Sequence, residues 1–247
     1  MRLEMDSLEE SGRYERQIRL FGVEGQKSLK KATALVVGAG GLGSSVTAYL
    51  AVAGMGRIIV VDGDVVEISN LNRQILHGAR DVGRSKAVSA AETVLGLNPE
   101  VDVEAVALFA DEDNLADLVS EADLVIDALD NFPARYLLNR AAIEIGVPLF
   151  HGAISGFNGQ ATTVIPEKTP CLRCIFPRSP PKETSPALGA TCGVIGSIQA
   201  SEAIKYLAGK GELLGGRLLI WDGLRAECDE IPIERNPRCG DCGVEEF

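Results

Sequence analysis

The sequence lacks the hydrophobic segments that membrane insertion or export requires. No apolar run in its 247 residues reaches the roughly 18 residues needed to cross a bilayer. Residues 1–7 contain no apolar stretch of the kind that directs secretion. Internal repeats and low-complexity tracts are also missing. We therefore expect a cytoplasmic protein without membrane contacts, and the 46% share of hydrophobic residues is enough for a sizeable core.

Positive charge is in short supply. The chain has 24 Lys and Arg against 35 Asp and Glu, a formal net charge of −11. Broad nucleic-acid binding requires a positive surface, so this composition argues against it. A partner with a basic patch remains compatible with it.

One stretch organises the chain. An apolar run and a glycine-rich turn occupy residues 35–43 (Leu-Val-Val-Gly-Ala-Gly-Gly-Leu-Gly), and a second apolar run at 58–62 ends in a carboxylate. That carboxylate, Asp62, lies nineteen residues past Gly43. The spacing predicts a strand–turn–helix–strand unit that binds a nucleotide, without saying which nucleotide.

Each polar or glycine position in this unit has an expected task. Gly38 permits the tight turn, and Gly40 and Gly41 let backbone N–H groups approach an anion. Gly43 lets the helix pack closely on the strand. Asp62 would accept hydrogen bonds from ribose hydroxyls.

Strands and helices alternate through the first 151 residues. This pattern predicts an α/β fold with a doubly wound, mostly parallel, Rossmann-like sheet. Ligands of such sheets lie outside the C-terminal strand ends, where we place Gly40, Asp62 and Asp130, so that one crevice can hold all three. The expected strands are 33–38, 57–62, 101–108, 123–127 and 147–151, and the expected helices are 42–54, one capped by Ser85 and stopped by Asn98-Pro99, one from Asp111, and 133–145.

The second half changes character and predicts antiparallel strands that extend the sheet. A hairpin is expected at 154–166, a proline-rich crossing loop at 177–186, a helix at 193–207, and strands at 217–222 and 226–233. We expect one domain over 1–247, with an N-terminal helical arm at 12–31, a nucleotide-binding half at 32–151 and a second half at 152–247.

The arm has an apolar and a basic side. Leu20, Phe21 and Leu29 are able to dock on the body of the protein. Arg13, Arg16 and Arg19 recur every three residues and so share a face, which spacing alone would assign to solvent.

Two Cys-x-x-Cys pairs give the strongest metal signal. Cys171, Cys174, Cys239 and Cys242 supply four thiolates, the donor set of a closed tetrahedral zinc site. Redox pairs and iron–sulfur clusters are the alternatives, but redox pairs usually precede a helix and the second pair lies in a tail. We expect structural Zn²⁺ that clamps the tail to the 167–176 loop and has no catalytic task.

The long connection at 63–81 and the helix after it carry candidate phosphate ligands. Asn70, Arg73 and Lys86 flank the predicted crevice, which favours phosphate binding over a role as surface cations. Asp130 follows a buried strand and could hold Mg²⁺, or it could cap the following helix.

Taken together, these motifs resemble the MoeB/ThiF/HesA family, the prokaryotic relatives of ubiquitin-activating enzymes. The resemblance runs from about residue 12 to residue 242. It rests on Arg13-Tyr-Glu-Arg16-Gln-Ile, Gly38-Ala-Gly-Gly-Leu-Gly43, Asp62-Gly-Asp, Ser69-Asn-Leu-Asn-Arg73-Gln, Gly83-Arg-Ser-Lys86, Asp127-Ala-Leu-Asp130-Asn131, Gly196-Ser-Ile-Gln-Ala-Ser-Glu-Ala-Ile-Lys205 and the cysteine pairs.

The resemblance implies an ATP-dependent adenylyltransferase. A ubiquitin-like sulfur-carrier protein of the MoaD/ThiS type would insert its C-terminal Gly-Gly tail, and the tail carboxylate would attack the α-phosphate of ATP. Acyl-adenylate and pyrophosphate would form. Which carrier is used stays open among the molybdopterin, thiamine and tRNA-thiolation pathways, as does whether one enzyme serves several carriers.

The resemblance also implies residue roles. Asp62 would bind the ribose, Asp130 would ligate Mg²⁺, and Arg16 would enter the site of a partner subunit, so that a homodimer with composite sites is expected. The implied catalytic residues are Arg16, Arg73, Lys86 and Asp130. The implied nucleotide-binding residues are Gly38, Gly40, Gly41, Gly43, Asp62, Asp64, Ser69, Asn70, Arg73, Lys86, Asp130 and Asn131.

One departure concerns cysteine. Several relatives carry a cysteine in the crossing loop that links covalently to the carrier, but residues 175–191 contain none. Cys192 lies just beyond, at the start of a helix, where the dipole would favour a thiolate, although we favour a small buried residue there. On that hypothesis the enzyme stops at the adenylate, as MoeB-like members do, and a separate sulfur donor completes the reaction.

Three other functions are compatible with parts of the sequence. An NAD-dependent oxidoreductase fits the glycine turn and Asp62 but leaves Arg73, Lys86 and Asp130 without a role. A relative that adenylates a tRNA base or a peptide terminus is disfavoured by acidic charge in the first case and by the cysteine pairs in general. The intact phosphate-binding set speaks against a non-catalytic scaffold.

Overall fold

A computed structural model describes residues 2–179 and 186–243, with side chains from residue 12 onward. The centre of the predicted crossing loop, 180–185, therefore lies outside the described residues. The helices are α1 (Arg2–Lys31), α2 (Gly41–Val52), α3 (Lys86–Leu97), α4 (Leu115–Ser120), α5 (Phe132–Ile145), α6 (Leu172–Ile175) and α7 (Gly189–Ala208), with 3₁₀ turns η1 (Ile68–Asn70) and η2 (Ala79–Asp81). The strands are β1 (Thr33–Val37), β2 (Arg57–Val61), β3 (Asp102–Val106), β4 (Leu124–Asp127), β5 (Leu149–Ser155), β6 (Asn158–Val164), β7 (Arg217–Asp222) and β8 (Glu227–Pro232).

All of these strands form one sheet with the order β3-β2-β1-β4-β5-β6-β7-β8. The pairs from β3 to β5 are parallel, and those from β5 to β8 are antiparallel. The predicted doubly wound sheet with an antiparallel extension is confirmed. The strand order reverses between β1 and β4, and such a reversal opens a crevice beyond the C-terminal strand ends.

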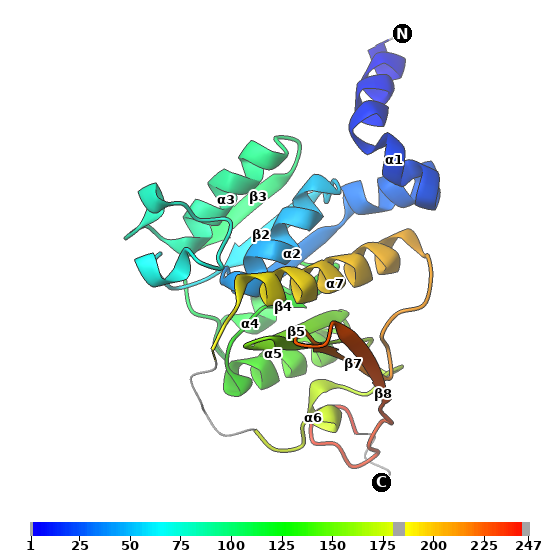
Figure 1. Ribbon diagram of the computed structural model, residues 1–247. Helices are drawn as coiled ribbons and strands as arrows, with labels where there is room; N and C mark the ends of the chain where they lie inside the picture. The colour runs from blue at the N-terminus through cyan, green and yellow to red at the C-terminus, as the bar shows by residue number, and fades with distance from the viewer. Residues whose placement is uncertain (1, 180–185, 244–247) are drawn as a thin grey trace.

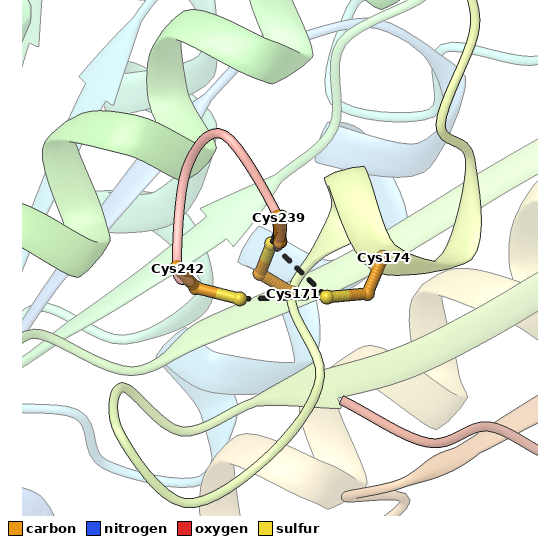
Figure 2. A group of neighbouring side chains, drawn as sticks. All are labelled: Cys171, Cys174, Cys239 and Cys242. Atoms are coloured by element: carbon orange, nitrogen blue, oxygen red, sulfur yellow. Dashed lines mark hydrogen bonds between the residues drawn. The ribbon is translucent and has the colours of Figure 1, made fainter. Parts of the chain in front are cut away.

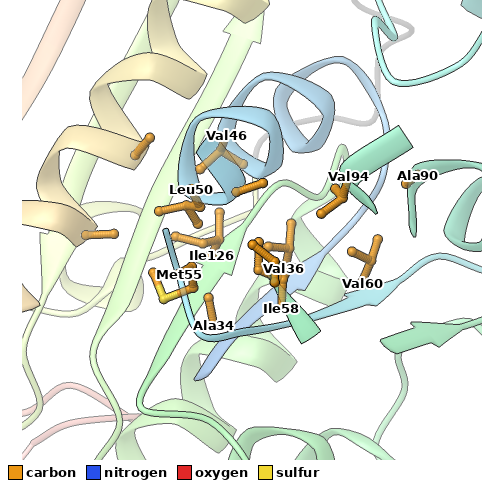
Figure 3. Close-up of a cluster of buried hydrophobic side chains, with 14 of the residues drawn as sticks. Ala34, Val36, Val46, Leu50, Met55, Ile58, Val60, Ala90, Val94 and Ile126 are labelled. Atoms are coloured by element: carbon orange, nitrogen blue, oxygen red, sulfur yellow. The ribbon is translucent and has the colours of Figure 1, made fainter. Parts of the chain in front are cut away.

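Helices cover both faces of the sheet (Figure 1). Val36 and Ile58 point to one face, where they pack with Leu50 of α2 and Val94 of α3 (Figure 3). The alternate residues of the same strands, such as Leu35, point to the other face and pack against α4 and α5. Side chains of a strand alternate between the two faces, so strands buried on both sides read as continuous apolar runs.

The arm differs from its prediction. Helix α1 begins at Arg2 and contains a break at Gly22, whose φ of 79° and ψ of 171° are not helical. Glycine adopts positive φ without steric penalty, which explains why the break falls there. Leu29 is fully buried as expected, but Leu20 is 79% exposed and does not dock on the chain.

Two other helices start away from their predicted positions. The side chain of Asp111 accepts hydrogen bonds from the backbone N–H groups of Asp113 and Asn114, so this stretch turns and α4 begins only at Leu115. Helix α7 begins at Gly189 instead of Gly193. Within the described residues, no helix combines the length and the apolar character that a bilayer crossing demands.

Candidate active site

The glycine turn joins β1 to α2 through very close packing. Gly38 has φ 105°, and a Cβ there would lie 2.6 Å from the carbonyl oxygen of Ala128. A Cβ on Gly43 would lie 1.8 Å from the carbonyl oxygen of Gly38. Only glycine fits at these two positions, as the motif predicts.

The next part of the turn faces open space. A Cβ on Gly40 would meet nothing closer than Gln74 Nε2 at 3.9 Å. Gly40 is the N-cap of α2 and supplies no side-chain cap, so the first amides of α2 are left for an anion. Gln74 is buried, and its Oε1 has no hydrogen-bond partner among the described residues. The backbone N–H groups beside this open space suit the oxygens of a phosphate, and Gln74 Oε1, which only accepts, suits an N–H or O–H group of the same ligand.

Asp62 is held at the ends of β1 and β2. Its Oδ2 accepts from the backbone N–H of Ala39 at 2.8 Å, and its Oδ1 accepts from that of Asp64 at 2.8 Å. A carboxylate oxygen has a second lone pair, so each remains able to accept from a ribose hydroxyl.

Lys86 reaches the same edge of the sheet. It opens α3 after the N-cap Ser85, and its side chain is 9% exposed. Its Nζ donates to Asp64 Oδ2 at 2.9 Å. The predicted site residue Asp64 thus orients the ammonium group and partly neutralises it.

The loop between β2 and α3 holds the remaining candidates. Asn70 is buried, and its Oδ1 accepts from the backbone N–H of Glu67, while Ser69 Oγ donates to the Glu67 carboxylate. Arg73 Nη1 donates to the carbonyl oxygen of Ser69 at 2.8 Å and to Asn72 Oδ1 at 3.0 Å. These bonds shape the loop and leave the other nitrogens of the Arg73 guanidinium for a phosphate.

The structure separates the roles of Asp130 and Asn131. Asn131 is the N-cap of α5, and its Oδ1 accepts from the backbone N–H of Ala134 at 3.0 Å. Asp130 does not cap the helix. Its carboxylate is exposed and accepts from Asn131 Nδ2 at 3.3 Å. An exposed carboxylate at the end of β4, next to β1, matches the chemistry of a Mg²⁺ ligand.

Arg16 lies away from the crevice of its own chain. Around it, Gln17 Nε2 donates to the carbonyl oxygen of Ala53 and Arg13 Nη1 to that of Leu97. These contacts lie at the C-terminal ends of α2 and α3, whereas Gly40 and Lys86 lie at the opposite ends. At 1.5 Å per residue, the length of α2 separates the two ends by about 18 Å.

Sequence reasoning missed both histidines of the chain as supports of the site. His77 is buried, with Nε2 3.0 Å from the carbonyl oxygen of Ala39 and Nδ1 2.9 Å from Ser89 Oγ. A carbonyl oxygen only accepts, so Nε2 carries the proton, and His77 ties the glycine turn to α3. Burial lowers the pKa of His77 and keeps it neutral.

His151 belongs to a second buried group. Its Nδ1 lies 2.7 Å from Asp127 Oδ2, and Arg135 Nε lies 3.6 Å from the same oxygen. Burial lowers the pKa of His151, an effect that the Asp127 carboxylate opposes. The only signal of this group in the sequence is that Asp127 ends an otherwise apolar strand and that Arg135 lies on the buried side of a helix.

Cys192 lies in the first turn of α7, under the glycine turn. It is 2% exposed, and its Sγ would be 2.6 Å from a Cβ on Gly41. Burial raises the pKa of its thiol, an effect that nearby Arg73 opposes. Its surroundings are those of a small buried residue, which confirms the burial predicted from the sequence.

The four paired cysteines converge on one point (Figure 2). Their sulfur atoms all lie within 4.8 Å of one another. Cys171 Sγ is 3.6 Å from Cys239 Sγ, and Cys174 Sγ is 3.4 Å from Cys242 Sγ. Tetrahedral zinc with Zn–S bonds of about 2.3 Å requires sulfur atoms about 3.8 Å apart, so the donor set and its spacing fit zinc.

A helix side chain bridges the two cysteine pairs. Asn139 of α5 accepts from the backbone N–H of Leu172 at 3.0 Å and donates to Asp241 Oδ2 at 2.9 Å. Leu172 and Asp241 lie inside the first and second Cys-x-x-Cys motif respectively. Asn139 therefore orients both pairs. Residues that hydrogen-bond around the ligands of a metal commonly have this role.

The chain is similar to known proteins over most of its length. A family model described as "ThiF family" matches residues 14–241. The SAMP-activating enzyme E1 of Haloferax volcanii is 48% identical over 239 residues, covering 94% of this chain and 88% of that protein. The sulfur carrier protein adenylyltransferase of Thermus thermophilus is 46% identical over 250 residues, covering 96% and 92%. The crystal structure of E. coli MccB with ATP superposes with a TM-score of 0.85 at 26% identity, covering 94% of this chain and 74% of that one.

Proposed function

The chain belongs to the ThiF family, and on this premise we propose that it is an ATP-dependent adenylyltransferase for the C-terminal carboxylate of a ubiquitin-like sulfur-carrier protein. One observation carries the proposal. The uncapped amides of α2, the ammonium group of Lys86 and the exposed carboxylate of Asp130 all lie at the C-terminal edge of β1, β2 and β4. That edge is where α/β proteins of this topology bind nucleotides.

The reaction is a displacement at phosphorus. An oxygen of the carrier carboxylate bonds to the α-phosphorus of ATP, the bond from that phosphorus to the bridging oxygen breaks, and pyrophosphate leaves. The amides at Gly40 and Gly41 and the cations of Arg73 and Lys86 stabilise the negative charge that moves onto the phosphate oxygens. Asp62 orients the nucleotide through its ribose.

Asp130 and Asn131 complete the nucleotide site. When bound, Mg²⁺ would neutralise part of the negative charge of the phosphates. Asp130 supplies a ligand oxygen for it, while Asn131 caps α5 and keeps Asp130 at the end of β4. The cysteine cluster holds Zn²⁺ in a closed site that joins the tail to the 167–176 loop, and reducing conditions such as those of the cytoplasm keep its thiols available.

The first experiment is pyrophosphate exchange. Purified protein should incorporate labelled pyrophosphate into ATP only when a MoaD/ThiS-type carrier ending in Gly-Gly is present. A carrier truncated by its last glycine is the control and should support no exchange. Exchange without carrier, or binding of NAD in place of ATP, would contradict the proposal.

A second candidate substrate is a peptide terminus. The MccB structures include a complex with AMPCPP and MccA at 26% identity, whereas the relatives named for sulfur carriers and SAMP are 46–48% identical. The higher identity favours the carrier. Molybdopterin, thiamine and tRNA-thiolation carriers share the same tail chemistry and are separated by testing each in the exchange assay.

The proposed enzyme is a homodimer whose sites are composite. Arg16 is exposed on α1 and lies away from the crevice of its own chain, which supports a role in the site of a second copy. The 32–151 half binds the nucleotide and the 152–247 half receives the carrier. A separate sulfur donor acts after the adenylate has formed.

Mixing two inactive variants tests the composite site. Arg16→Ala and Asp130→Ala should each be inactive alone. Random exchange of subunits makes half of the dimers mixed, each with one intact site, so about one quarter of wild-type activity should return. No recovery, with subunit exchange verified by tags, would show that each chain uses its own Arg16 or none.

A further inference from the structure

We propose that the buried ion pair between Asp127 and Arg135 positions Asp130 for metal binding. The proposal rests on the role assigned to Asp130 under the proposed function. Neither residue reaches the crevice, so both are positioning residues.

The pair forms hydrogen bonds to both backbone polar groups of Leu129, the residue that precedes Asp130. The backbone N–H of Leu129 donates to Asp127 Oδ1 at 3.1 Å, and Arg135 Nη2 donates to the carbonyl oxygen of Leu129 at 2.5 Å. On the other side, Asn131 is fixed as the N-cap of α5. The backbone around Asp130 is therefore held on both sides, and the Asp130 side chain is left for the crevice.

The pair is itself anchored to two further elements, β5 and α7. Asp127 ends β4 and is 0% exposed, and Arg135 lies in α5 at 5%. His151 of β5 contacts Asp127 Oδ2 at 2.7 Å, and Arg135 Nη2 also donates to the carbonyl oxygen of Gly152 at 3.3 Å. Gln199 of α7 donates to the backbone carbonyl of Asp127. Because these anchors come from separate helices and strands, the pair fixes the Asp130 turn relative to the whole sheet.

Stability alone does not explain such a pair. Removing two charges from water costs about as much as their attraction returns, and well-packed apolar residues of similar volume are often as stable or more so. Arg135 Nε also forms no hydrogen bond among the described residues. The guanidinium group of Arg135 contacts the carbonyl oxygens of Leu129 and Gly152 at once and so orients the backbone at Leu129. The flexible ammonium group of a lysine could not reproduce this geometry.

The test is Arg135→Met, with Mn²⁺ as the probe. Electron paramagnetic resonance would titrate Mn²⁺ into the protein saturated with the ATP analogue AMPCPP. Mn²⁺ affinity should fall by about 10–100-fold, the range seen when residues that orient a metal ligand are removed. AMPCPP affinity without metal should stay within about twofold of wild type. Arg140→Met is the matched control, because Arg140 lies on the same helix, is half exposed and pairs with Asp241.

A double variant separates positioning from folding. Arg135→Met alone leaves the buried Asp127 carboxylate without its guanidinium counterion, with the contacts from His151 and the Leu129 N–H retained, and should lower the melting temperature. Asp127→Asn with Arg135→Met removes both charges and should regain most of the lost stability. We expect the double variant to keep the weakened Mn²⁺ affinity. Recovery of Mn²⁺ affinity together with the melting temperature would overturn the proposal.

Further outcomes distinguish this proposal from the one it rests on. Wild-type Mn²⁺ affinity in Arg135→Met, with carrier-dependent exchange intact in wild type, would overturn the positioning role alone. Unchanged Mn²⁺ affinity in Asp130→Ala would overturn the positioning role as well, because Asp130 would then not be a ligand of the metal. Absence of carrier-dependent exchange in wild type would instead overturn the proposed function.

Discussion

Replacing Asp130 with alanine should abolish adenylate formation and leave the fold intact. The carboxylate is exposed and does not cap α5, so its removal breaks no buried contact. A metal that stabilises transferring phosphate contributes several kcal/mol to the transition state, and a loss of about 3–4 kcal/mol corresponds to a rate decrease of about 10²–10³-fold. Pyrophosphate exchange measures the rate, and circular dichroism and thermal melting report on the fold.

The matched control is Asp117→Ala. Asp117 is an exposed residue of α4, which packs on the face of the sheet near α5, and its backbone carbonyl accepts a hydrogen bond from Ser120 Oγ. This variant should exchange pyrophosphate at the wild-type rate. Normal exchange in Asp130→Ala would refute the role assigned to Asp130.

Removing the metal from the cysteine cluster should have the largest effect on stability. The four thiols bring the first cysteine pair together with a tail 68 residues later, so removing the metal removes the bonds that would join the two pairs. If zinc contributes even about 4 kcal/mol, the melting temperature should fall by about 8–16 °C. ATP affinity should change much less, because the residues proposed to bind ATP, the glycine turn and Lys86, lie at the edge of the parallel strands and are not part of the cysteine cluster.

Metal analysis, thermal melting with and without a strong chelator, and ATP titration test this prediction together. Cys239→Ser should reproduce the effect of the chelator. Cys228→Ser is the control, since Cys228 is exposed on β8 outside the cluster and its loss should leave the melting temperature unchanged. Native protein that contains no metal would contradict the zinc assignment, and so would a chelator that changes nothing.

Much of the site was predictable because its signals are local. The glycine turn followed by Asp62 requires one strand–turn–helix unit, and the hydrogen bond from Ala39 to Asp62 shows that this unit closes as expected. Ser85 caps α3 and Lys86 opens it, as their order in the chain predicted. Asp130 was identified by its place after a buried strand.

Predictions were less accurate where neighbouring residues have the same local preference. Asp130 and Asn131 are both good N-caps, and the extended backbone of Asn131 (φ −137°, ψ 143°) decided which of them caps α5. Helical spacing in the arm did not show that Gly22 breaks α1. It also did not show that Leu20 faces away from the body of the chain.

The amino-acid sequence by itself determined the strand and helix order, the nucleotide motif, the two cysteine pairs and the family, because each depends on residues close together in the chain. The tertiary structure alone decided which distant groups meet: the joining of the cysteine pairs, the contact of His77 with the glycine turn, and the grip of Asp127 and Arg135 on Leu129. The physical reason is that such contacts depend on how elements pack around a shared sheet. A position along the chain specifies the element that carries a side chain but not the neighbour that the element will face.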